Sequence, residues 1–136
     1  MKIIFDTNII LDVLAHREPF FEKSRAVMQF VAENKVKGAI TANIVTDIFY
    51  VLRKHMDNET LKTALRNLME LFEVVEVSQI DCISALDLTI KDYEDSLLIC
   101  CAKRWKADCI ITRNIGDFKY SPVKAITPAD FLKDNL

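Results

Sequence analysis

Four aspartates, far apart in the chain, stand at places where a carboxylate could do chemistry rather than only face solvent: Asp6, Asp47, Asp95 and Asp117. Asp6 directly follows the short apolar run Ile3-Ile4-Phe5. An apolar run that stops at an acid is typical of a buried strand that delivers a polar side chain to the edge of a sheet. Because ligands of open α/β sheets bind just outside the carboxyl ends of the strands, we ask which other acids converge on Asp6.

Each of the other three acids has an ordinary structural alternative. Asp47 could be an exposed helix acid paired with Lys54 two turns later. Asp95 could simply favour the N-terminus of its helix through the helix dipole, and Asp117 could be a turn or capping residue. Asp6 is the hardest to explain in this way, because a carboxylate at the end of a buried strand needs a partner. Together, the expected strands and helix starts place all four acids at one edge of the same sheet.

A cluster of carboxylates in one pocket has a defined chemical consequence. The side chains repel one another, and their pKa values rise unless a cation relieves the repulsion. Magnesium or manganese suits such oxygen ligands and needs neither histidine nor thiolate. Such a site can use a metal-bound water as nucleophile and hold a scissile phosphate, and two ions about 3.5–4 Å apart could stabilise both the attacking and the leaving oxygen. We therefore predict Mg²⁺ or Mn²⁺ as the cofactor.

The rest of the pattern predicts the elements that must position these acids. Strands and helices alternate, which predicts an α/β fold: a three-layer sandwich with a central, mostly parallel sheet of about four to five strands flanked by helices, joined by right-handed crossovers. We expect a single domain over residues 1–136, because no linker, repeat or low-complexity segment is visible. The expected strands lie at 3–5, 39–41, 72–77, 107–112 and 124–127, and the expected helices at 9–14, 19–34, 43–54, 57–71, 79–89, 93–106 and 129–136.

Composition narrows the class of protein. Of 136 residues, 51% are hydrophobic and 28% are charged, with only two glycines and three prolines, which favours a helix-containing globular fold over a turn-rich all-β fold. The formal net charge of −2 lacks the basic surplus that nucleic-acid binders usually show. If the protein binds nucleic acid, metal ions rather than lysines must supply the positive charge at the site.

Cysteines and histidines give no sign of a second kind of metal site. The four cysteines, at positions 82, 100, 101 and 109, form no Cys-x-x-Cys pair and lie far in sequence from the two histidines. This argues against zinc and favours small buried side chains in a reducing cytoplasm. His16 and His55 are isolated, and we assign neither a catalytic role. No signal peptide or membrane span is visible, so we expect a cytoplasmic protein without membrane association.

Four blocks of sequence, in this order, carry a family resemblance. They are Asp6-Thr7-Asn8 after the first strand, Asp47 in the third helix, Asp92-Tyr93-Glu94-Asp95 at the start of a helix, and Thr112-Arg113-Asn114 with Asp117-Phe118. Together they make nearly the whole chain resemble the PIN-domain family of small metal-dependent ribonucleases, which includes VapC-type toxins. No single block is specific, and the resemblance rests on the order and spacing of all four.

The resemblance implies a role for each matched residue. Asp6, Asp95 and Asp117 correspond to metal ligands, and Asp47 corresponds to a second acidic position that many members fill with glutamate. Whether the shorter Asp47 side chain reaches the metal directly or through water stays open. The remaining matched positions are expected to orient carboxylates or water, or to add one acid near the site: Asn8, Thr112 and Asn114 in the first role, and Asp92 in the second.

Three cations and one aromatic residue complete the candidate site. Arg17, Lys54 and Arg113 are candidate phosphate contacts, although each could equally be a solvated surface cation. Tyr50 lies three residues after Asp47 and could reach the same groove, but a place in the core or in an interface is the simpler interpretation.

The resemblance implies an Mg²⁺- or Mn²⁺-dependent endoribonuclease that acts on RNA, with a protein antitoxin as partner and a homodimer as the assembly; cleavage of DNA stays open. One alternative is a receiver-like, magnesium-binding signalling domain. That fold needs paired acids after the first strand and an acceptor aspartate at the end of the third, where this chain has a single Asp6 and Val77-Ser78. Another alternative is a non-catalytic RNA-binding module on the same fold.

Overall fold

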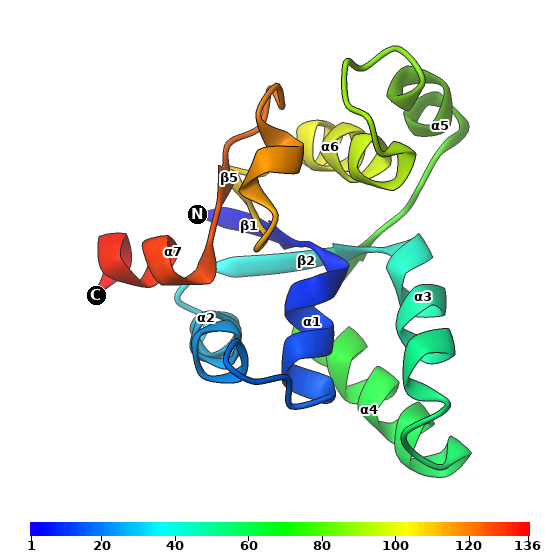
Figure 1. The fold of residues 1–136 in the computed structure, drawn as a ribbon, viewed down its shortest axis with the longest axis vertical. Coiled ribbons are helices and arrows are strands. Elements are labelled where there is room, and N and C mark those ends of the chain that lie inside the picture. Colours follow the sequence, from blue (N-terminus) through cyan, green and yellow to red (C-terminus); the bar gives the residue numbers. More distant parts are fainter.

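Five short strands lie side by side and form the middle layer of the fold (Figure 1). Their order in the sheet is β3-β2-β1-β4-β5, and every neighbouring pair is parallel. The computed structural model describes all 136 residues. The strands are β1 (Lys2–Phe5), β2 (Lys37–Thr41), β3 (Glu73–Val75), β4 (Cys109–Ile111) and β5 (Ala125–Ile126).

The N-terminal strand β1 occupies the centre of the sheet because it is apolar on both faces. Ile4 pairs with Ala39 of β2 on one side and with Ile110 of β4 on the other. The run Ile3-Ile4-Phe5 is fully buried, as a parallel strand between two layers of helices requires. The predicted buried strand that ends at Asp6 is therefore confirmed.

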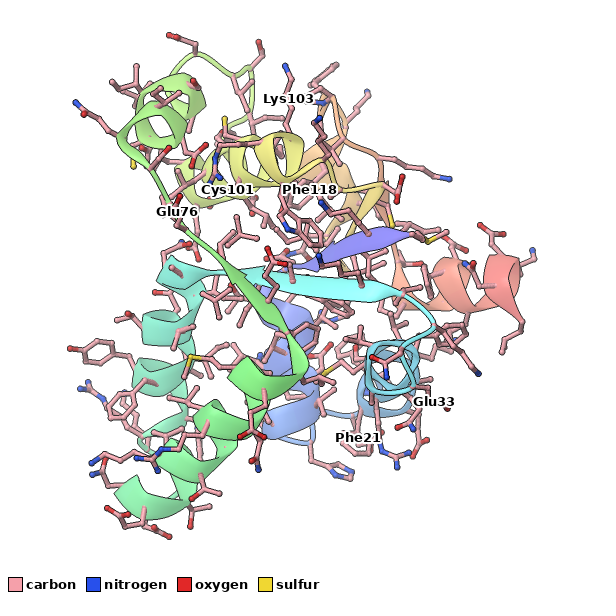
Figure 2. The ribbon with its side chains drawn as sticks, turned by 180° about the vertical axis from the view of Figure 1, so that it is seen from behind. Phe21, Glu33, Glu76, Cys101, Lys103 and Phe118 are labelled. Carbon is pink, nitrogen blue, oxygen red and sulfur yellow. The ribbon has the colours of Figure 1, made fainter.

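Seven helices cover the two faces of the sheet, which confirms the predicted three-layer α/β architecture (Figure 1). The helices are α1 (Thr7–Leu14), α2 (Phe21–Ala32), α3 (Ala42–Leu52), α4 (Asn58–Leu71), α5 (Gln79–Ala85), α6 (Tyr93–Trp105) and α7 (Pro128–Asn135), and a 3₁₀ turn, η1 (Ile115–Phe118), follows β4. Helices α1 to α4 and α7 pack on one face, and α5 and α6 on the other. Figure 2 shows this layering from behind, with Cys101 and Phe118 on the α6 side and Phe21 and Glu33 on the α2 side. No helix combines the length and the apolar character that crossing a bilayer requires.

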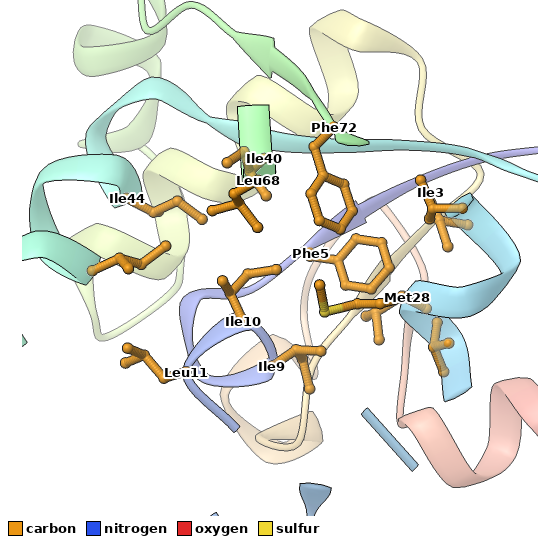
Figure 3. Packing of buried hydrophobic residues seen from close by; sticks show 14 of the residues in the cluster. Ile3, Phe5, Ile9, Ile10, Leu11, Met28, Ile40, Ile44, Leu68 and Phe72 are labelled. Atoms are coloured by element: carbon orange, nitrogen blue, oxygen red, sulfur yellow. The ribbon is translucent and has the colours of Figure 1, made fainter. Parts of the chain in front are cut away.

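Strand alternation divides the apolar side chains of β1 between two hydrophobic cores. Ile3 and Phe5 point into the larger core of 20 buried residues, part of which Figure 3 shows from close by, and Ile4 points into a core of 10 against α6. In the larger core, Phe5 and Phe72 pack edge to face with ring centroids 4.9 Å apart. Burying one large apolar side chain stabilises a fold by about 1.5–3 kcal/mol. The three buried residues of β1 therefore fix the position of the strand and of Asp6, which follows it directly.

The third strand is shorter than the predicted strand at 72–77. Phe72 still closes the last turn of α4, because its N–H donates to the carbonyl of Leu68. β3 lies at the edge of the sheet, and its only partner is β2, which pairs with it along Ala39–Thr41. Pairing therefore ends at Val75, two residues earlier than predicted.

The fifth helix also ends earlier than the predicted range 79–89. It stops at Ala85, and the backbone N–H groups of Leu86, Asp87 and Leu88 donate to carbonyls three residues back. Bonds of this spacing tighten the chain into 3₁₀-like turns. The segment between α5 and α6 is consequently a loop that leads to Asp92.

Gly38 in β2 lies so close to two buried side chains that no larger residue fits. A Cβ atom there would lie 2.7 and 2.9 Å from the Cγ atoms of Val31 and 3.0 Å from Cδ1 of Phe72. Gly38→Ala should therefore lower the free energy of unfolding by about 1–3 kcal/mol, the usual effect of overpacking a core. Gly116→Ala is the matched control, because nothing lies within 4 Å of a Cβ at that position. Equal stability of the two variants in chemical denaturation would contradict this packing.

Candidate metal-binding active site

A cleft of about 500 Å³ lies at the carboxyl edge of the sheet. Helices α1 and α3 begin there directly after β1 and β2, and the first turn of α6 and the turn η1 complete the walls. The structure brings all four predicted aspartates together in this cleft, and no lysine, arginine or histidine lines it. Six acidic residues line it in total: Asp6, Asp47, Asp92, Glu94, Asp95 and Asp117.

Three neighbouring groups donate hydrogen bonds to the carboxylate of Asp6. Oδ1 accepts the backbone N–H of Thr7 at 2.8 Å and so caps α1. Oδ2 accepts the hydroxyl of Thr112 at 2.8 Å and the amide of Asn8 at 3.3 Å. Asp6 is only 9% exposed, and burial raises its pKa, while the hydrogen bonds from Thr112 and Thr7 act in the opposite direction.

The segment after β4 positions the remaining polar groups. Thr112 is fully buried, and its Oγ1 also accepts the backbone N–H of Asn114 at 3.1 Å. The side chain of Asn114 lines the cleft, and its carbonyl accepts the N–H of Asp117 at 3.0 Å. Two of the residues predicted to orient groups, Asn8 and Thr112, thus contact Asp6 directly, and the third, Asn114, is linked to it through Thr112.

Of the acids at the start of α6, Asp92 caps the helix and Asp95 is a candidate metal ligand. Asp92 caps the helix, since its Oδ1 accepts the backbone N–H of Asp95 at 3.1 Å. Asp95 lies in the first turn and lines the cleft. Loss of water contacts, and then the negative charges of Asp6, Asp92 and Asp117, raise the pKa of Asp95 to about 7. Ionisation of this carboxyl is therefore unfavourable, first because it loses hydration and then because neighbouring carboxylates repel it.

Glu94 is an acid of the cleft that was not assigned a role from the sequence. Loss of water contacts, and then a hydrogen bond and charge repulsion with Asp47, raise its pKa to about 7. Its place two residues after the capping Asp92 could have revealed it, because side chains of a first helical turn fan out around the helix N-terminus. The cleft therefore holds one acid from α3, Asp47, and three from the start of α6, Asp92, Glu94 and Asp95.

The chemistry of these donors fits a hard divalent cation. Carboxylate and amide oxygens line the cleft without histidine or cysteine, the set that Mg²⁺ and Mn²⁺ prefer. Oδ1 of Asn8 is buried without a hydrogen-bond partner, and a water molecule carried by a hydrated ion would satisfy it. No three acidic, histidine or cysteine side chains converge on one point at ligand distance.

None of the three cations considered as phosphate contacts lines the cleft. Arg113 turns toward α1, with Nε 2.8 Å from Oδ2 and Nη2 3.1 Å from Oδ1 of Asp12, and it covers the ring of Phe20 at 3.8 Å. Asp12 is fully buried, and removing its cation would leave an uncompensated charge. Arg113 therefore holds a structural ion pair. Arg17 and Lys54 follow the C-terminal ends of α1 and α3, outside the cleft.

Two further interpretations of single residues change with the structure. Asp47 is half-buried and lines the cleft, and no ion pair joins it to Lys54, so it differs from the exposed, paired helix acid considered above. Tyr50 is not a core residue, because it is 55% exposed and lines the cleft. His16 stacks on Phe21 and contacts Glu18, and it does not line the cleft.

The fold and the cleft can be set beside known proteins. The family model of the PIN domain matches residues 2–116. The chain belongs to the PIN-domain family. Ribonuclease VapC1 of Aquifex aeolicus (strain VF5) is 26% identical to this PIN-domain chain over 137 residues, which cover 96% of this chain and 92% of that protein. The resemblance seen in four blocks of sequence is therefore confirmed.

Solved structures share this PIN fold. A chain of VapBC2 from Rickettsia felis, solved with a promoter DNA fragment, has a TM-score of 0.68 at 18% identity, and the match covers 93% of this chain and 98% of that one. A chain of a toxin–antitoxin complex from Klebsiella pneumoniae has a TM-score of 0.67 at 20% identity, with 92% and 96% covered. At such identities the likeness concerns the fold alone, and it agrees with the predicted PIN-like architecture.

The architecture also argues against a receiver-like signalling domain. β3 is an edge strand, and none of the three residues directly after it, 76–78, lines the cleft. The next residue, Glu76, is exposed, and its carbonyl accepts a hydrogen bond from Arg104. No acidic side chain at the end of the third strand therefore lies beside Asp6 to accept a phosphoryl group.

Repulsion in the cleft should make the stability of the protein in chelator depend on pH. The pKa values of Glu94 and Asp95, about 7, lie above their ordinary values of 4.5 and 3.8. Between about pH 4 and pH 7 the folded protein therefore holds more protons than the unfolded chain, so stability falls as the pH rises. Because these groups are partly screened by solvent, we expect a melting temperature roughly 2–5 °C higher at about pH 5.5 than at about pH 7.5, which corresponds to about 1 kcal/mol.

Asp95→Asn provides the control for this pH effect. The variant lacks one repelling charge, so its melting temperature should differ less between the two pH values. Asp81 does not contribute in this range, because hydrogen bonds from Arg104 and Ser78 outweigh its burial and lower its pKa to about 2. A wild-type protein that melts at the same temperature at both pH values would contradict the repulsion.

Proposed function

We propose that this protein is a metal-dependent endoribonuclease that hydrolyses phosphodiester bonds in RNA with Mg²⁺ or Mn²⁺. The observation that carries the proposal is the convergence of Asp6, Asp47, Asp95 and Asp117 on one cleft without a protein cation among them. The name of the relative Ribonuclease VapC1, which aligns along nearly the whole chain, supports RNA as the substrate.

In this proposal the cleft residues hold and orient the reacting groups. Asp6, Asp95 and Asp117 would hold the cation, and Asp47 would join them directly or through water. When bound, Mg²⁺ or Mn²⁺ lowers the pKa of a coordinated water and neutralises the charge that develops on a phosphodiester. Thr112 and Asn8 fix the direction of the Asp6 carboxylate, which keeps one member of the site in place while the others close in.

Electrostatics explains why such a site depends on its cation. Six carboxylates repel a phosphodiester strongly, and no lysine or arginine is among the residues that line the cleft. The nearest cations act from outside it: Lys91 lies beside Asp92 and Asp117, and Arg113 lowers the pKa of Asp6. The net charge of −2 supplies no general attraction to RNA either. A divalent ion would offset part of this negative charge and offer the phosphate a cationic ligand, so substrate binding and metal binding are coupled in this proposal.

The proposed biological setting is that of a toxin restrained by a protein antitoxin. Support comes from the structural likeness to chains of VapBC2 and of the Klebsiella pneumoniae toxin–antitoxin complex. The family resemblance also supports a homodimer as the assembly. A cytoplasmic location suits the four cysteines, which are all free thiols.

Cleavage of a labelled single-stranded RNA tests the proposed activity. We expect cleavage with Mg²⁺ or Mn²⁺, none with chelator, and a rate at least about a hundredfold lower for Asp6→Asn, the scale of loss when a charge-stabilising group is removed. Asparagine caps a helix as well as aspartate does, so α1 should stay folded in this variant.

Two controls accompany this assay. Asp134→Asn, on the exposed end of α7, should cleave like the wild type, and a DNA strand of the same sequence shows whether DNA is also a substrate. Equal cleavage by wild type and Asp6→Asn would identify a contaminating nuclease and remove the catalytic proposal. Metal-independent RNA binding without cleavage would instead favour a non-catalytic RNA-binding module.

A further inference from the structure

One wall of the cleft carries an exposed aromatic ring. Tyr50 and Val51 follow Asp47 on α3, and all three line the cleft. Tyr50 is one helical turn beyond Asp47, and residues at this spacing lie on the same helix face with Cβ atoms about 5–6 Å apart. Tyr50 is 55% exposed. Carboxylates line the same cleft, and they disfavour a purely apolar binding partner at this ring.

Neighbouring side chains hold the ring in a defined position. The guanidinium of Arg53 lies 4.6 Å from the ring centroid, and Phe49 packs edge to face against it at 6.1 Å. Arg53 forms no salt bridge, so its positive charge is free. Because Arg53 covers one face of the ring, the exposed area lies on the rest of it. A second aromatic plane could therefore stack on Tyr50.

We propose that Tyr50 stacks on an unpaired base next to the cleaved phosphodiester and so positions the RNA strand in the cleft. This inference rests on the proposed nuclease function. A phosphate held at the acids has its own base one ribose away, and Tyr50 lines the same cleft one helical turn from Asp47. In a duplex both faces of each base are covered by neighbouring bases, whereas unpaired bases are free to stack on aromatic side chains.

The composition of the cleft favours a base over a protein side chain as the group on Tyr50. Only three of the twelve lining residues are hydrophobic: Leu11, Tyr50 and Val51. This is enough for one flat base but small for the apolar centre of a protein interface. A base also carries amino groups that can donate hydrogen bonds to the nearby carboxylates, and Arg53 can meet the next phosphate of the strand.

The test measures binding of an unstructured RNA oligonucleotide that carries 2-aminopurine, whose fluorescence falls when it stacks. Titrations with Ca²⁺ in place of Mg²⁺ compare wild type, Tyr50→Ala and Tyr50→Phe. We expect Tyr50→Ala to bind about tenfold more weakly, the effect of losing one base–aromatic stack, and to lose the fluorescence change. Tyr50→Phe keeps the ring and should behave like the wild type, and none of the proteins should show the change with a fully paired hairpin.

Tyr120→Ala is the matched control. Tyr120 is 69% exposed and also lies beside a cation, with Lys119 Nζ 5.5 Å from its ring, but it does not line the cleft. Tyr120→Ala should bind RNA like the wild type, and all variants should keep the wild-type melting temperature.

Several results would overturn the inference. The first is that Tyr50→Ala binds RNA as tightly as the wild type, and the second is that the wild type does not bind RNA. The third is that Tyr50→Ala changes the mass of the assembly but not RNA binding, which would assign the ring to a protein interface. Cleavage by both proteins with equal RNA affinity would remove the role of Tyr50 and leave the nuclease function intact. RNA binding that depends on Tyr50 without any cleavage would support the contact between Tyr50 and RNA and remove the nuclease function.

Discussion

Repulsion among like charges at the carboxyl edge of the sheet is the constraint on which the rest of this protein depends. Six carboxylates share one cleft, and the pKa values of Glu94 and Asp95 rise to about 7 as a result of lost hydration and of neighbouring charges. A fold under no functional demand would let these side chains turn into water. Here the end of β1, the middle of α3, the start of α6 and the turn η1 hold them together, and a divalent cation is the proposed source of relief.

Two polar contacts with fully buried partners keep the edge of the sheet rigid enough for this. The hydroxyl of Thr112 joins the end of β4 to Asp6 at the end of β1. One residue later, Arg113 binds Asp12 in α1, and Asp12 also accepts the hydroxyl of Ser24 in α2. The segment that carries Asn114 and Asp117 is thus tied to three elements. Such a fixed frame allows the acids to move toward a cation without a change in the fold.

The fold and the convergence of the acids could be predicted because both follow from position along the chain. An apolar run that ends at Asp6 fixes the central strand, and parallel strands bring every following loop to the same edge. The direction of a side chain is not encoded in this way. Arg113 was considered either a phosphate contact or a solvated surface cation, yet it pairs with the buried Asp12, an acid that the apolar pattern of α1 does not single out. Tyr50 was considered for the groove, but a place in the core or an interface was preferred, and the structure excludes the core. Sequence alone does not show which face of α3 borders the cleft, and Glu94 went unassigned for the same reason in α6.

The central claim is that the acids of the cleft bind a divalent cation. It is tested most directly by calorimetric titration of Mn²⁺ into protein that has been treated with chelator and from which the chelator has then been removed. The account predicts saturable binding by the wild type and by Asp134→Asn, which changes an exposed acid of α7, and at least about tenfold weaker binding by Asp6→Asn, the scale on which altered metal sites lose affinity. Equal Mn²⁺ affinity of wild type and Asp6→Asn, or no binding by the wild type at millimolar Mn²⁺, would contradict it.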